Sequence, residues 1–182
     1  MSTKNNKKAF KAGLKVAKEK IHLVLLRRLA EYGQELLESA QFQAQYTSFT
    51  GNTLTSLAFG LYENNVLTDI VFISGLKPPI RVKVPEGKWV YLAEPYEGTA
   101  RSVYGSVSIS DDWGDETSIR TLKGLCPKGG NGIIVTTGTE YSTFLENVHG
   151  LNVLSDTYLE ARNNALSEMN NWIDVNKPIE RL

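Results

Sequence analysis

The chain has 182 residues, of which 41% are hydrophobic and 22% are charged, which is typical of one globular domain with a buried core. Lys and Arg number 20, and so do Asp and Glu, so no net charge draws the whole molecule to nucleic acid or to an anionic membrane. The single cysteine, Cys126, excludes a disulfide within the chain and favours a reducing compartment.

The first predicted element is a helix from about Lys7 to Phe42. Its apolar residues recur at steps of three and four, and no proline interrupts the run. At about 1.5 Å per residue the helix would span about 50 Å, which exceeds a compact domain of this size, so we expect part of it to protrude and to need a partner. Its apolar stretch Ile21–Leu26 is short and precedes two arginines, so we expect no signal peptide, no membrane span and residence in a cytoplasm.

Two strands are predicted next, Leu54–Tyr62 and Val66–Ser74, joined by a turn around Asn64. The segment Thr50-Gly51-Asn52 ends the helix before them. In the first strand, Leu57, Phe59 and Leu61 alternate with Ala58, Gly60 and Tyr62. In the second, both faces are apolar, which is typical of a covered strand.

Residues 77–123 are interpreted as an inserted arm or hairpin. Ile80–Val84 alternates cleanly and predicts a short strand, and further strands are predicted at Lys88–Leu92 and Tyr104–Ser110. Asp111–Thr117 is predicted to be an acidic loop.

The chain is predicted to close with a strand, Ile133–Thr137, and a helix that ends near Ile173. Ser155 is the predicted N-cap of that helix, and Asp156 suits the positive end of its dipole. The order of elements predicts one α+β domain over residues 1–182. In it, a long N-terminal helix and a C-terminal helix pack on a small antiparallel β-sheet.

The residue types that carry chemistry form no recognisable catalytic arrangement. His22 and His149 are far apart in the sequence and lack a third ligand at metal spacing, and Cys126 has no paired base. The glycine-rich stretch 123–132 lacks the order of a phosphate-binding loop, and residues 111–116 lack the spacing of a calcium loop. We therefore predict no enzyme activity, no cofactor and no metal; a small hydrolase with an unrecognised site is the weaker alternative.

Charged residues supply the candidate interfaces. Five lysines fall on one face of the predicted first helix: Lys4, Lys8, Lys11, Lys15 and Lys18. This stripe is either a solvated face or a contact surface for phosphates or for acidic groups on an adjoining subunit. The candidate acidic surface consists of Asp111, Asp112, Trp113, Asp115 and Glu116.

Several segments together resemble the family of phage tail-completion or head–tail joining (neck) proteins, in particular members from phages of gut Bacteroidetes. The first is Thr50-Gly51-Asn52-Thr53-Leu54-Thr55-Ser56, at the start of the predicted hairpin. The second runs from Ile133 through Tyr141-Ser142-Thr143-Phe144-Leu145-Glu146. The most specific is His149-Gly150-Leu151-Asn152-Val153-Leu154. Thr53 is an extra residue relative to the family pattern, and Asn152 stands where an acidic residue is usual.

The resemblance covers about residues 7–75 and 125–175 and implies a structural virion protein. Such proteins form rings that join the portal and head to the tail, so it implies self-association, contact with portal or adaptor and tail proteins, and a place in the virion neck. DNA passing through the ring could be contacted non-specifically. We expect the basic end of one subunit to meet the acidic loop of the next, as in a closed head-to-tail ring. The alternative is a DNA-binding module that uses the lysine stripe.

Overall fold

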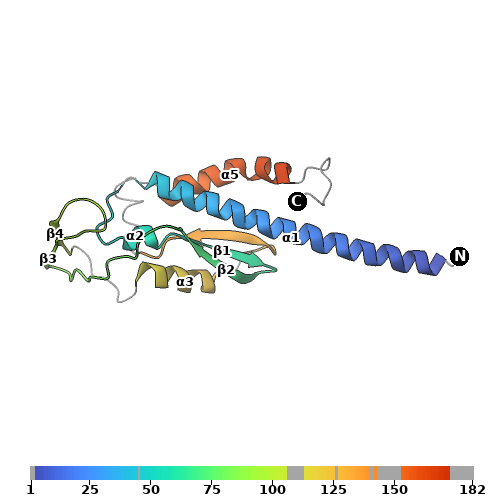
Figure 1. Ribbon diagram of the computed structural model, residues 1–182, viewed down its shortest axis with the longest axis horizontal. Coiled ribbons are helices and arrows are strands. Elements are labelled where there is room, and N and C mark those ends of the chain that lie inside the picture. Colours follow the sequence, from blue (N-terminus) through green and yellow to red (C-terminus); the bar gives the residue numbers. More distant parts are fainter. Residues whose placement is uncertain are drawn as a thin grey trace.

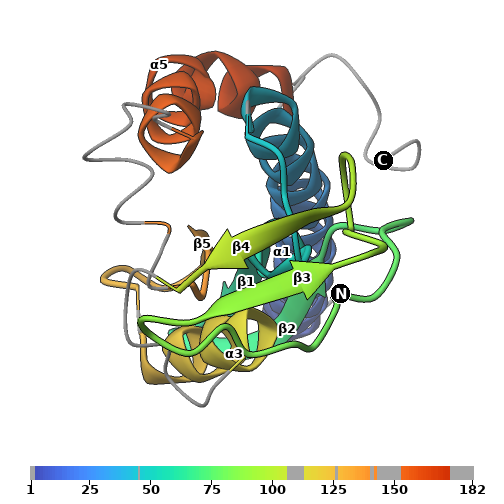
Figure 2. The same ribbon diagram turned by 90° about the vertical axis from the view of Figure 1, so that its left-hand side faces the viewer.

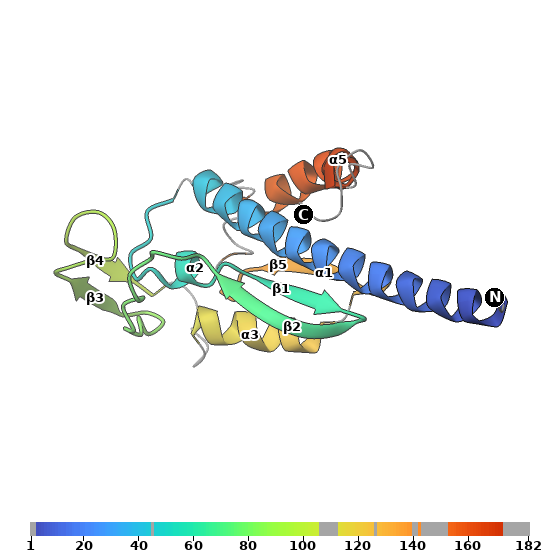
Figure 3. The ribbon, with the colours of Figure 1, turned by 45° about the vertical axis from the view of Figure 1, so that its right-hand side comes forward.

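The computed structural model describes residues 3–44, 46–105, 113–125, 127–139, 142 and 153–172. In chain order, its elements are α1 (Thr3–Gln43), α2 (Asn52–Thr55), β1 (Ala58–Glu63), β2 (Val66–Phe72), β3 (Trp89–Leu92), β4 (Arg101–Tyr104), α3 (Gly114–Gly124), β5 (Gly132–Thr136) and α5 (Val153–Trp172). The predicted α+β class is confirmed. Helices α1 and α5 lie over one face of a small antiparallel sheet, and α3 lies over the other (Figures 1 and 3).

The main sheet has three strands in the order β2-β1-β5, and both pairings are antiparallel. β1 and β2 form a hairpin in which Glu63 pairs with Val66. The two residues between them, Asn64 and Asn65, have φ angles of 50° and 66°. Two-residue hairpin turns favour this left-handed conformation, and asparagine tolerates it better than most residues. The predicted hairpin is therefore confirmed, with β1 rather than β2 at the centre of the sheet.

The alternating side chains of β1 pack against different helices. Phe59 packs under α1, where Gly33 leaves room for its ring: a Cβ at Gly33 would lie 2.8 Å from Phe59 Cε2. On the opposite face, Tyr62 Oη donates a hydrogen bond of 2.6 Å to the carbonyl of Leu122 in α3. Gly60 lies on that same face, next to Leu122. The alternation predicted from the sequence thus separates the two faces of the sheet correctly.

The core lies where α1, β1 and the start of α5 meet. Leu37, Ala40, Phe59 and Val153 belong to one buried cluster. α5 runs antiparallel to the C-terminal half of α1 (Figure 1). Tyr32 Oη donates to the carbonyl of Ala161 at 3.3 Å, which ties the two helices together.

The predicted strand Ile80–Val84 is wrong, because this segment is irregular. The Ile80 amide donates to the carbonyl of Thr50, and the Val82 amide donates back to the Ile80 carbonyl. Neither bond belongs to a strand ladder. Ile80 packs against the core and Val84 is buried, so the alternation reflects burial of one side and not strand pairing.

Three further boundaries differ from the predictions. Residues 52–55 form the short helix α2, so the first strand begins at Ala58 and not at Leu54. The predicted acidic loop Asp111–Thr117 is wrong from Gly114 onward, because α3 begins there and its acidic residues occupy the first turn, where the helix dipole favours them. α5 begins at Val153, so Ser155 lies inside the helix and is not its N-cap.

The remaining predicted segments fall partly outside the described residues. Strand β4 ends at Tyr104, and residues 106–112 of the predicted strand and loop lie outside the described residues. The same holds for Ile173 and, apart from Ser142, for the segment Tyr141–Glu146 that carries part of the family resemblance. Within 77–123, β3 and β4 pair as a separate hairpin at the end of the molecule opposite the N-terminus, whereas α3 packs on the main sheet (Figures 1 and 2).

Candidate interaction surfaces

The N-terminal part of α1 extends beyond the sheet (Figure 1). Residues 3–20 of α1 are here called the overhang. The helix leaves the sheet at His22, whose ring is held on both sides. Glu63 Oε1 lies 2.6 Å from Nε2, and Asn131 Nδ2 lies 3.3 Å from Nδ1. From residue 6 to residue 20 every described side chain is exposed except Ala17, and no described element covers the overhang.

The lysine stripe lies on the overhang, and the structure leaves it in solvent. Lys8, Lys11, Lys15 and Lys18 are all exposed, while for Lys4 only the helical backbone position is described. Lys15 Nζ lies 3.8 Å from Glu19 Oε1, but both side chains are well exposed and such a pair contributes about 1 kcal/mol or less. Residues 1–20 contain seven lysines and one glutamate, a net charge of +6, so the rest of this neutral chain carries −6.

An apolar stripe runs beside the lysines. Phe10, Leu14 and Ile21 recur at helical spacing, and they are 72%, 47% and 55% exposed. At about 100° per residue, this stripe continues the side of α1 that carries Tyr32 and Ser39, which contact α5. The overhang therefore extends the α5-facing side of α1 past the part of the helix that α5 covers.

The lysines extend a different side of the same helix. Helical spacing of three and four residues places His22 on the same side of α1 as Lys18. Farther along the helix, the same side carries Gly33, Leu36 and Ala40. These last three residues are buried and lie on the side of α1 that faces the sheet. The sheet-facing side of α1 is thus apolar where the sheet is present and basic where it is not.

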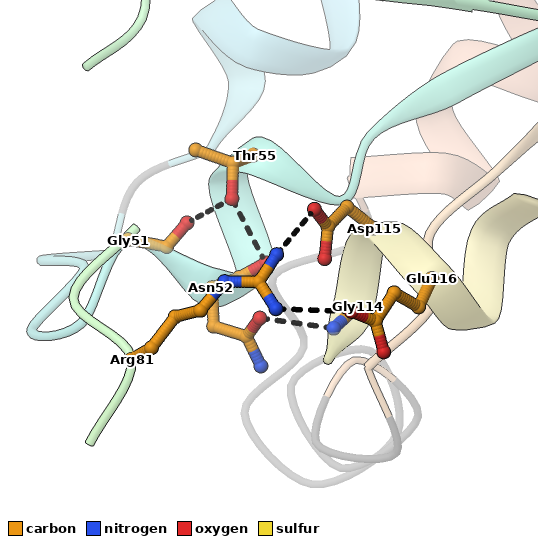
Figure 4. A network of polar contacts seen from close by, with 7 residues as sticks. All are labelled: Gly51, Asn52, Thr55, Arg81, Gly114, Asp115 and Glu116. Carbon is orange, nitrogen blue, oxygen red and sulfur yellow. Dashed lines mark hydrogen bonds and ion pairs between the residues drawn. The ribbon is translucent and has the colours of Figure 1, made fainter. Parts of the chain in front are cut away.

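The described part of the predicted acidic surface is already engaged within the chain (Figure 4). Arg81 donates to Asp115 Oδ2 at 3.1 Å and to Glu116 Oε1 at 3.0 Å. Its guanidinium carbon lies 5.1 Å from the centre of the Trp113 ring. The amide of Gly114 donates to Asn52 Oδ1 at 2.9 Å, so α2 caps the start of α3. Asp111 and Asp112 lie outside the described residues, as do Cys126 and His149.

Sequence reasoning missed Arg81 as the partner of these carboxylates. It also missed an aromatic face on the β3–β4 hairpin. Trp89, Tyr91 and Tyr104 are 69%, 65% and 48% exposed, and the Trp89 and Tyr104 rings lie 5.2 Å apart. The alternation of aromatic residues around Val90 is the signal that could have located this face.

Within the part of the chain that the structure describes, no three His, Cys, Asp or Glu side chains gather closely enough to hold a metal ion. Among the described helices, none is long and apolar enough to cross a membrane. No protein-family model matches the chain, and neither the curated proteins nor the solved structures include a significant match.

Proposed function

We propose that this chain is a structural subunit of a phage neck, which forms a ring joining the portal and head to the tail. The observation that supports it best is the overhang. Most helical stability in proteins comes from packing an apolar face against another element. The overhang has such a face at Phe10, Leu14 and Ile21, and within the described residues nothing covers it.

The distribution of charge also supports a ring. A ring requires two different surfaces on each subunit, and each must fit its counterpart on the next subunit. The overhang carries +6 and the remainder of the chain carries −6, so two copies attract one another end to end and repel overhang to overhang. The family resemblance implies the same kind of closed assembly.

Electron microscopy of the purified full-length chain, alone and mixed with a portal, tests the proposal. We expect ring-shaped particles, in isolation or on the portal, and a mass that is a fixed multiple of the monomer. A chain that stays monomeric in both samples and is absent from purified virions would contradict the proposal.

The lysine stripe supports a second candidate, a DNA-binding module. Lys8, Lys11, Lys15 and Lys18 are exposed along one side of the overhang, where a phosphate backbone could meet them. If all four contact phosphates, the logarithm of the binding constant should fall with the logarithm of salt concentration with a slope of about −3.6. A salt titration with the full chain separates the candidates, because tight binding at physiological salt favours the module, and weak or absent binding favours the neck subunit.

A further inference from the structure

The C-terminal half of α1 carries a second exposed stripe whose charge is opposite to that of the overhang. Glu35, Glu38 and Phe42 follow one another at spacings of three and four, which places them on one side of the helix. All three are exposed, and Phe42 is 90% exposed. We call these residues the acceptor stripe. The sequence holds no Lys or Arg between Arg28 and Lys77, so the stripe lies in an acidic stretch of the chain.

The overhang and the acceptor stripe cannot meet within one subunit. Both belong to α1, which is one continuous helix of 41 residues. Lys11 and Glu35 are separated along it by about 36 Å, at about 1.5 Å per residue. A straight helix cannot fold back on itself, so only a second copy can bring these two stripes together.

The acceptor stripe is also better suited to the overhang than the described part of the acidic surface at the start of α3. Asp115 and Glu116 already pair with Arg81 of their own chain. Glu38 accepts a hydrogen bond from the neutral Gln34, and Glu35 has no cationic partner among the described residues. In addition, Phe42 offers an exposed ring that can pack against the apolar stripe of the overhang.

We propose that the overhang of one subunit docks on the acceptor stripe of a second copy of this chain. Phe10 and Leu14 pack beside Phe42, and the neighbouring lysines face Glu35 and Glu38. This contact is head-to-tail, because it uses different surfaces on the two copies, and it leaves a free overhang and a free acceptor stripe at the ends of any open assembly. The inference rests on the proposed neck function, since it names the contact through which the ring would close.

Two double variants of the full chain test the contact, one on each side of it. The overhang variant is Phe10→Gln with Leu14→Gln, and the acceptor variant is Glu35→Gln with Phe42→Gln. Glutamine is a good helix former, so neither variant should unfold α1, which circular dichroism checks.

The matched control is Val16→Gln with Leu23→Gln. These residues are also exposed, at 52% and 65%, but they lie on another side of the same helix.

Sedimentation velocity measures the outcome over a range of protein concentrations at physiological salt. We expect the wild-type chain and the control to assemble, and each double variant to remain monomeric or to associate at least about tenfold more weakly. An equimolar mixture of the two variants should form a one-to-one dimer that grows no further. In that mixture only one intact overhang and one intact acceptor stripe remain, and they lie on different chains.

The contrary results separate this inference from the proposed function. If the wild-type chain assembles and both double variants assemble equally well, the overhang contact is wrong while the ring proposal stands. If the mixture of variants grows beyond a dimer, the contact is not head-to-tail and the inference is likewise wrong. If the wild-type chain is monomeric at every concentration and also fails to form rings on a portal, both proposals are wrong.

Discussion

Replacing Gly33 by alanine tests whether the close approach of α1 to the sheet depends on a missing side chain. The added Cβ would lie 2.8 to 2.9 Å from three atoms of the Phe59 ring. Carbon atoms in good contact are about 3.5 to 4.0 Å apart, so the helix or the ring must move by roughly 0.6 to 1.2 Å. Overpacking of this kind in a buried site costs about 1 to 3 kcal/mol, and alanine returns about 1 kcal/mol through its better helix propensity.

Gly13→Ala provides the matched control, because Gly13 lies on the same helix and a Cβ there meets nothing within 4 Å. This control should gain about 1 kcal/mol in the free energy of unfolding from helix propensity alone, to the extent that the overhang unfolds with the domain. Urea denaturation of both variants gives the comparison, and Gly33→Ala should be less stable than Gly13→Ala by about 1 to 3 kcal/mol. Equal stability of the two variants would refute the packing argument.

Three further predictions concern single contacts. Tyr62→Phe removes the hydroxyl that donates to the Leu122 carbonyl of α3 and leaves that carbonyl only the long 3.4 Å bond from the Leu125 amide. This variant should lower the free energy of unfolding by about 1 to 2 kcal/mol in urea denaturation, and an unchanged value would contradict the contribution of the hydrogen bond. Asn52→Ala removes the acceptor for the Gly114 amide and should cost about 1 kcal/mol by the same measurement, whereas Asn52→Asp should retain most of the stability. The hydrogen bond from Arg27 is the main cause that holds the pKa of Glu31 below its ordinary value of 4.5. The ionised Glu31 side chain therefore stabilises the folded state above that pH, and this stabilisation is lost as the pH falls through the lowered pKa. Glu31→Gln should therefore weaken the loss of thermal stability in acid, and an identical acid profile would contradict this reasoning.

Local patterns predicted the elements that pack in regular ways. The steps of three and four in α1 and the alternation of Phe59 and Tyr62 are short-range signals, and each reports one buried side of one element. The same rule failed at Ile80–Val84. In that segment one side of the chain is partly buried by contacts with loops, and no described strand pairs with it. Burial of one side alone produces the same alternation of apolar and polar residues.

The candidate surfaces divide in a similar way. The positions of the lysine stripe follow from helical spacing alone, so they could be predicted, and its exposure follows from where the sheet ends. The partner of Asp115 and Glu116 could not be predicted, because Arg81 lies more than 30 residues away in the sequence and meets them only through the tertiary fold. Interpreting residues 111–117 as a loop also concealed the start of α3, although acidic residues in a first turn are a helix signal.

The sheet-facing side of α1 changes from basic in the overhang to apolar over the sheet. The overhang is therefore encoded in the sequence and does not simply result from a helix that is too long. If the sheet extended under residues 8–18, four lysines would face it, and burying their charges without partners would cost several kcal/mol each. The lysines therefore keep this half of the helix away from any apolar sheet, including that of a neighbouring copy. The apolar stripe beside them has no such restriction. The proposed partner would then approach from the side of Phe10 and Leu14 and present acidic groups toward the lysines, which is the combination that Phe42 and Glu35 offer on a second copy.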